Sequence, residues 1–171
     1  VERPVRVTRE QPPGGGPVAA IGAGLELVHT DVVVVLAADM PWAVPPVIGL
    51  AAEMGPEDVR VPLAGGHLQG LAAVYRVSAL RQADLVAGSS MRHLLDRLNL
   101  HVVAMPEALF ADIDTPTDLA AAQRRLAIMD PDEERVDMQK WLDAVKKELG
   151  VEAEIDVDLI LDVAKDAAHN V

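Results

Sequence analysis

Three aspartates in two short motifs are the residues of this chain best placed to do chemistry. Asp39 lies in the segment VVVVLAADMP at 32–41, and Asp112 and Asp114 lie in FADIDTPTDL at 110–119. Carboxylate oxygens are the ligands that Mg²⁺ prefers, and the ion usually takes one or two of them together with substrate phosphates. Three carboxylates converging at one edge of a sheet therefore predict a divalent cation that holds a phosphorylated ligand.

Each aspartate also has a purely structural interpretation. Asp39 could cap the helix that opens near Pro45 or fix a loop, Asp114 could form an Asx-turn or N-cap before Pro116, and Asp112 could simply face solvent. Capping accounts for one of the last two residues but not for both. A helix start also favours anions, so capping and metal binding are compatible at this position.

The segments around the aspartates predict how they are positioned. The apolar run 32–36 is typical of a buried parallel strand, and ligands of open α/β sheets bind at the carboxyl ends of such strands. Further strands are expected at 59–63, 68–75 and 100–105, and helices at 18–28, 45–55, 78–86, 91–98 and 116–128. Strands separated by helices indicate an α/β fold with a mostly parallel sheet covered on both faces.

A glycine-rich loop, Gly14-Gly15-Gly16-Pro17, precedes the first expected helix. Its backbone N–H groups could cradle a phosphate or a base at the helix start. No lysine follows, as a P-loop requires, and an ordinary turn is the alternative interpretation.

Composition changes near residue 130. Residues 1–129 hold 14 acidic and 10 basic residues, all of the latter arginine, whereas 130–171 hold 13 acidic and 5 basic residues. We expect a linker at 130–135 and a small acidic helical domain at 136–171. A segment of this length rarely folds alone. We therefore expect it to dock on the first domain, on a protein partner or on a second copy in a homo-oligomer.

The overall composition excludes several classes of protein. The chain has no cysteine, 2% aromatic residues, a net charge of −12 and no apolar run of membrane-spanning length. Disulfides and cysteine-ligated metals are excluded, and neither a nucleic-acid surface nor a membrane partner is expected. A soluble, cytoplasmic protein fits these features.

Four motifs together resemble the MobA-like nucleotidyltransferases, the family of molybdenum cofactor guanylyltransferases. They are PPGGGPVAA at 12–20, LAADMP at 36–41, QGLAAVYR at 69–76 and DIDTPTDL at 112–119, in the family's order. The resemblance covers roughly residues 5–128. Residues 136–171 resemble the small helical domain of unassigned function that follows such transferases in some actinobacterial proteins.

The resemblance implies a Rossmann-like three-layer sandwich of the nucleotide-diphospho-sugar transferase type. It implies transfer of GMP from GTP to the phosphorylated molybdopterin cofactor, with Mg²⁺ and release of pyrophosphate. Asp39 resembles the magnesium-binding carboxylate, while Asp114, and less closely Asp112, fall beside the metal and phosphates. Gly16 and Pro17 match the segment that contacts the base.

One departure from the family pattern affects the expected activity. The family opens with a Leu-x-Gly-Gly-x-Ser-x-Arg-Met-Gly-x-x-Lys loop around the triphosphate, and no such loop occurs here; no lysine precedes Lys140. The 171 residues as given are therefore expected to be inactive. Two alternatives stay open: transfer of CMP or another nucleotide to a small phosphorylated acceptor, and a non-catalytic nucleotide-binding or regulatory homologue.

Overall fold

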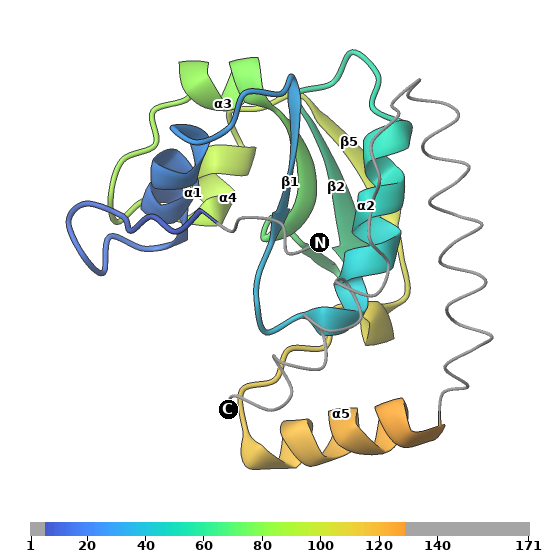
Figure 1. The fold of residues 1–171 in the computed structure, drawn as a ribbon. Coiled ribbons are helices and arrows are strands. Elements are labelled where there is room, and N and C mark those ends of the chain that lie inside the picture. Colours follow the sequence, from blue (N-terminus) through green and yellow to red (C-terminus); the bar gives the residue numbers. More distant parts are fainter. Residues whose placement is uncertain (1–5, 129–171) are drawn as a thin grey trace.

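The computed structural model describes residues 6–128 as a sheet with helices on both faces (Figure 1). The strands are β1 (Val32–Leu36), β2 (Val59–Ala64), β3 (His67–Leu68), β4 (Ala72–Arg76) and β5 (Leu100–Ala104). The helices are α1 (Pro17–Leu25), η1 (Pro41–Ala43), α2 (Val44–Ala52), α3 (Val77–Gln82), α4 (Met91–Leu95), η2 (Glu107–Leu109) and α5 (Pro116–Ile128). The predicted linker at 130–135 and helical domain at 136–171 lie outside the described residues.

The sheet is mixed, with three of its strands running in one direction. β2 pairs with β5 in parallel, and β4 lies between β1 and β2 and pairs antiparallel with both. β1, β2 and β5 therefore share one direction, and their carboxyl ends lie at the same edge. β4 runs the other way because β2, the two-residue β3 and β4 follow one another through short turns, which cannot make the crossover that parallel pairing needs.

Two apolar cores lie on opposite faces of the sheet and confirm the three-layer arrangement. On one face, Val59, Ala73 and Tyr75 pack with α1, α3 and α4. On the other face, Ala72 and Val74 pack with α2. The alternation of buried side chains along β4 follows from the two-residue period of a strand, so consecutive residues supply both cores.

The structure shortens several expected elements. The predicted strand at 68–75 is divided into β3 (His67–Leu68) and β4 (Ala72–Arg76), because residues 69–71 form a turn between them. The Gly70 carbonyl turns inward and accepts a hydrogen bond of 2.6 Å from the buried Tyr75 hydroxyl. Burial of that hydroxyl raises the pKa of Tyr75.

The described part of the chain contains no helix long and apolar enough to cross a membrane.

Candidate functional site

Asp39 lies just beyond the carboxyl end of β1. The strand's last ladder contact is the hydrogen bond of 2.7 Å from the Ala37 N–H to the Leu71 carbonyl, after which the chain turns. Pro41 then begins η1. The proline ring fixes φ at a value that suits the first residue of a helix. Asp39 is exposed between these two elements, at the edge of the sheet where the sequence predicts it.

The second motif is fixed against the first by one backbone hydrogen bond. The Ile113 N–H donates to the Asp39 main-chain carbonyl at 3.0 Å, and the Ile113 side chain is buried. Asp112 and Asp114 flank Ile113 and are exposed. The structure therefore brings together the two segments that carry the three predicted aspartates, although they lie far apart in the sequence.

The three carboxylates themselves do not form one cluster. Within residues 6–128, no group of three or more histidine, aspartate or glutamate side chains is close enough to hold a metal ion. The side chains of Asp39, Asp112 and Asp114 also make no hydrogen bond or salt bridge within that range. They are free oxygen donors at one edge, and a site built from two of them, Asp39 and Asp114, stays a prediction.

The structure decides which residue caps α5. The Thr115 hydroxyl accepts a hydrogen bond of 3.2 Å from the Asp118 N–H, while the Asp118 carboxylate accepts bonds from the Thr115 N–H and hydroxyl. This is a reciprocal capping box with aspartate at the third position. These hydrogen bonds lower the pKa of Asp118, and the bond from the Thr115 hydroxyl has the largest effect. Because Thr115 is the cap, Asp114 is not needed for that role.

Replacing Thr115 by alanine should destabilise the protein by about 1 kcal/mol, since the cap hydrogen bonds are lost. The same substitution should raise the pKa of Asp118 toward its ordinary value. Thr117→Ala is the matched control, because Thr117 is exposed in the same first turn and makes no such bond. Urea unfolding measures the first effect and an NMR titration of the Asp118 carboxyl the second; equal effects of the two substitutions would contradict this role of Thr115.

The glycine loop opens α1 as predicted. Gly16 precedes the helix with φ +86°, a conformation that favours glycine, and Pro17 occupies its first turn. The loop is held by the Gly88 N–H, which donates to the Gly15 carbonyl at 2.8 Å. A Cβ added to Gly16 would meet nothing within 4 Å, so its backbone is open to a ligand.

An apolar cavity connects the glycine loop with the end of β1. It has a volume of about 370 Å³, and Pro17, Leu36 and Ala37 all line it. The predicted base-contacting segment, through Pro17, and the first acidic motif, through Leu36 and Ala37, therefore line the same cavity. The sequence predicts each segment separately, but only the fold shows that they adjoin one cavity.

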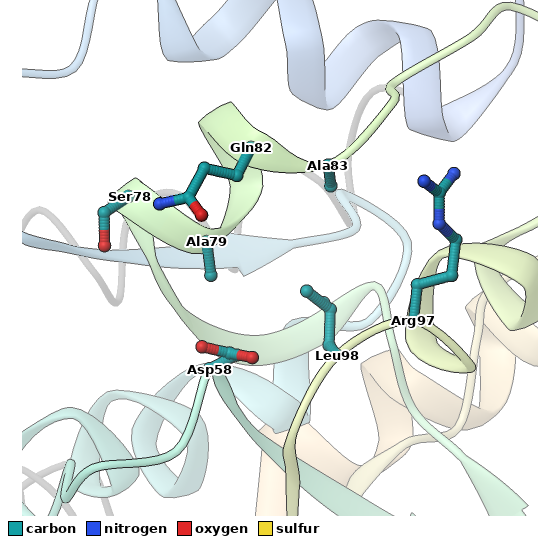
Figure 2. Close-up of a pocket in the computed structure, with 7 residues that line it drawn as sticks. All are labelled: Asp58, Ser78, Ala79, Gln82, Ala83, Arg97 and Leu98. Atoms are coloured by element: carbon teal, nitrogen blue, oxygen red, sulfur yellow. The ribbon is translucent and has the colours of Figure 1, made fainter.

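A second, more polar pocket lies at the opposite edge of the sheet (Figure 2). Asp58 precedes β2, Leu98 precedes β5, and both line the pocket with Arg97, whose side chain extends away from the Asp58 carboxylate. One Asp58 oxygen accepts a hydrogen bond of 2.9 Å from the Asn99 N–H. Sequence reasoning missed this pocket because Asp58 and Arg97 stand in no motif. It lies at the amino ends of β2 and β5 and is separate from the Asp39 edge.

The comparisons with known proteins show which family the sequence is similar to. The sequence profile of the MobA-like NTP transferase domain matches residues 1–127, and that of a domain of unknown function, DUF6457, matches residues 133–171. A probable molybdenum cofactor guanylyltransferase of Natronomonas pharaonis is 31% identical over 130 residues, which are 69% of this chain and 64% of the relative. A protein of the same description from Chloroflexus aggregans is 35% identical over 53% of this chain and 46% of the relative.

Among solved structures, the crystal structure of molybdopterin-guanine dinucleotide biosynthesis protein A from Archaeoglobus fulgidus is 29% identical. The match covers 67% of this chain and 64% of that protein, with a TM-score of 0.47. The chain thus spans about half to two thirds of the length of these relatives. Because the family profile extends over most of the sequence and includes both acidic motifs, the chain belongs to the family of MobA-like NTP transferase domains.

Proposed function

We propose that this chain is the nucleotide-transfer domain of a molybdenum cofactor guanylyltransferase. In this reaction a terminal phosphate oxygen of molybdopterin attacks the α-phosphorus of GTP, the bond to the β-phosphate oxygen breaks, and pyrophosphate leaves. The names of the relatives support the choice of GMP as the transferred group. The observation that carries the proposal is the hydrogen bond from the Ile113 N–H to the Asp39 carbonyl, which holds both acidic motifs at one edge.

The donor set fits a magnesium ion. Asp39 and Asp114 are exposed and unpaired within the described residues, and they lie on two segments joined by that backbone bond. Two carboxylates plus phosphate oxygens and water are the ligands that Mg²⁺ commonly takes. Bound Mg²⁺ would supply positive charge against the charge on the reacting phosphates. Asp112 is the alternative second ligand, because it flanks Ile113 on the other side.

The remaining work of the chain is to position the nucleotide. Pro17 lines the cavity that leads to the end of β1, and the backbone of the preceding Gly16 is open, which supports the assignment of both residues to the base. A nucleotide lying between this segment and Asp39 would present its phosphates to the carboxylates. Phosphoryl transfer depends mainly on such positioning and charge neutralisation.

The two family matches also support a division of the chain. We propose a transferase domain at 1–129, a linker at 130–135 and a separate helical domain at 136–171, in line with matches that end at 127 and begin at 133. The second domain is the part of the chain that we assign to a protein partner or a second copy. Its acidic excess favours a partner surface with basic residues.

A thermal melt with different nucleotides tests the proposed function. A ligand at one hundred times its Kd stabilises the native state by about 2.7 kcal/mol, so GTP with Mg²⁺ should raise the melting midpoint by several degrees. CTP and ATP at the same concentration should raise it less. A larger shift with CTP would favour cytidylyl transfer over guanylyl transfer. No shift with any nucleotide and Mg²⁺ would contradict the proposal that this chain binds a nucleotide.

A further inference from the structure

The motif at 69–76 supplies none of the residues assigned to the metal or the base, yet its turn at 69–71 lies beside both. The Leu71 side chain lines the apolar cavity of about 370 Å³ together with Pro17. The Leu71 carbonyl accepts the hydrogen bond of 2.7 Å from the Ala37 N–H at the end of β1. The turn therefore contacts the nucleotide cavity with a side chain and the first acidic motif with its backbone.

Tyr75 holds this turn from inside the protein. It is the only tyrosine of the chain, its side chain is fully buried, and its hydroxyl donates the hydrogen bond of 2.6 Å to the Gly70 carbonyl. A buried carbonyl that loses its partner destabilises the conformation that contains it. Because Gly70 is also buried, the inward orientation of its carbonyl depends on this hydroxyl.

Helix α4 and strand β2 also support the turn. A Cβ added to Gly70 would meet the side chains of Met91 and Leu95 at 3.1 and 3.2 Å, so glycine lets the backbone approach α4 closely. The turn is bonded to β2 through the hydrogen bond of 2.9 Å from the Gln69 N–H to the Pro62 carbonyl. The turn is thus fixed by its own contacts and forms a rigid support for the segment bonded to it.

We infer that Tyr75 is a positioning residue of the nucleotide site, which acts through the turn at 69–71. Its hydroxyl fixes the turn, and the Leu71 carbonyl of the turn fixes the end of β1, just before Asp39. The Asp39 carbonyl in turn accepts the Ile113 N–H, so the same series of hydrogen bonds reaches the second acidic motif. The inference rests on the proposed function, because it places the nucleotide between the apolar cavity and Asp39.

Tyr75→Phe is the direct test, since it removes only the hydroxyl and keeps the ring in the core. The Kd of GTP with Mg²⁺, measured by titration calorimetry well below the melting midpoint, should rise by at least about tenfold, as is common when a group that orients a metal ligand is lost. Val77→Ala is the matched control, because Val77 is buried in the same core but follows β4 at the end opposite to the turn. It should lower the melting midpoint and change the Kd by less than about twofold.

Amide exchange without nucleotide tests the same contacts independently of the proposed function. In Tyr75→Phe, the Ala37 amide, which donates to the Leu71 carbonyl, should exchange at least about tenfold faster relative to the Met105 amide. Met105 lies at the same edge of the sheet and donates to a carbonyl of β2 at 3.0 Å, in a bond that the turn does not make. The ratio of the two exchange rates should be unchanged in Val77→Ala.

A second variant interrupts the series one step nearer to Asp39 and leaves the core unchanged. Ala37→Pro removes the N–H that bonds to Leu71, so it should raise the Kd of GTP at least as much as Tyr75→Phe does, even where Tyr75→Phe folds poorly. If both substitutions act through the turn, adding Tyr75→Phe to Ala37→Pro should raise the Kd by less than about a further twofold.

The inference is overturned if Tyr75→Phe leaves either the Kd or the exchange ratio unchanged, if Val77→Ala changes them equally, or if the effects of Tyr75→Phe and Ala37→Pro multiply. A wild-type chain that binds no nucleotide would contradict the proposed function instead. In that case an unchanged exchange ratio in Tyr75→Phe would separately overturn the role of Tyr75 in positioning the Asp39 segment.

Discussion

Replacing Asp39 by asparagine should abolish the magnesium dependence of nucleotide binding and leave the fold intact. The neutral amide oxygen is a far weaker ligand for a hard cation than a carboxylate. Asp39 is exposed, its side chain makes no hydrogen bond or ion pair with a described residue, and the carbonyl that accepts the Ile113 N–H is kept in the variant. The free energy of unfolding without nucleotide should therefore change by less than about 0.5 kcal/mol.

The measurement is a set of melts with GTP in the presence of Mg²⁺ or of a chelator. The wild-type chain should be stabilised by about 2.7 kcal/mol at one hundred times the Kd with Mg²⁺ and much less with the chelator. The Asp39→Asn variant should show the same small shift in both conditions. Asp96→Asn is the control, because Asp96 is also exposed and lies at the end of α4. A variant that loses stability but keeps its metal dependence would show that Asp39 is a structural residue.

A pair of substitutions then separates the two carboxylates beside Ile113. Asp114→Asn should weaken the magnesium-dependent stabilisation, and Asp112→Asn should have the smaller effect if Asp114 is the second ligand. Both residues are exposed and neither caps α5, since Thr115 has that role. The reverse order of effects would assign the second ligand to Asp112.

The sequence predicted those features of the site that depend on local pattern. A run of five apolar residues ending near a carboxylate predicted both β1 and the position of Asp39 beyond its end. The cap of α5 also follows a local pattern, because Thr115 and Asp118 have the spacing of a capping box, whose hydrogen bonds join residues three apart. Pro17 and Gly16 likewise marked the start of α1.

Features that depend on contacts between distant segments could not be predicted in this way. The hydrogen bond from the Ile113 N–H to the Asp39 carbonyl is made by backbone groups, which every residue carries, so no residue type signals it. The placement of β4 between β1 and β2 follows from how the chain turns at Gln69–Leu71, and the sequence of this short segment does not specify which strands will pair. The separation of the Asp39, Asp112 and Asp114 carboxylates in space also depends on side-chain positions, which the spacing of these residues in the sequence does not fix.

A buried ion pair, between Glu57 and Arg60, was also missed. Glu57 and Arg60 are buried, and the Arg60 Nε donates to the Glu57 carboxylate at 2.8 Å. The Glu57 carboxylate also accepts a bond of 3.1 Å from the Gly55 N–H, which fixes the loop between α2 and β2. Charged residues are seldom buried, so Glu57 and Arg60 were not predicted to lie in the core.

Replacing Glu57 by glutamine should therefore destabilise the protein by about 2–3 kcal/mol at neutral pH, because it removes the only buried carboxylate that pairs with the buried Arg60 within the described residues. Glu53→Gln is the matched control. Its carboxylate also contacts Arg60, at 2.7 Å, but its side chain is 64% exposed, against 7% for Glu57. An exposed partner contributes about 1 kcal/mol or less. Urea unfolding at pH 7 measures both, and equal losses would contradict the role assigned to burial.

The pH dependence of Glu57→Gln provides a second test. Burial alone would raise the pKa of Glu57, but the hydrogen bonds from the Gly55 and Glu57 N–H groups and from Arg60 outweigh it and lower the pKa to about 2. A carboxyl with a lowered pKa stabilises the native state above its unfolded pKa, about 4.5, and loses that contribution as the pH falls toward 2. The difference in unfolding free energy between wild type and Glu57→Gln should therefore be constant from pH 7 to about 5 and should shrink between about 4.5 and 2. A difference that stays constant down to pH 2.5 would mean that the effect arises from packing and not from the charge of Glu57.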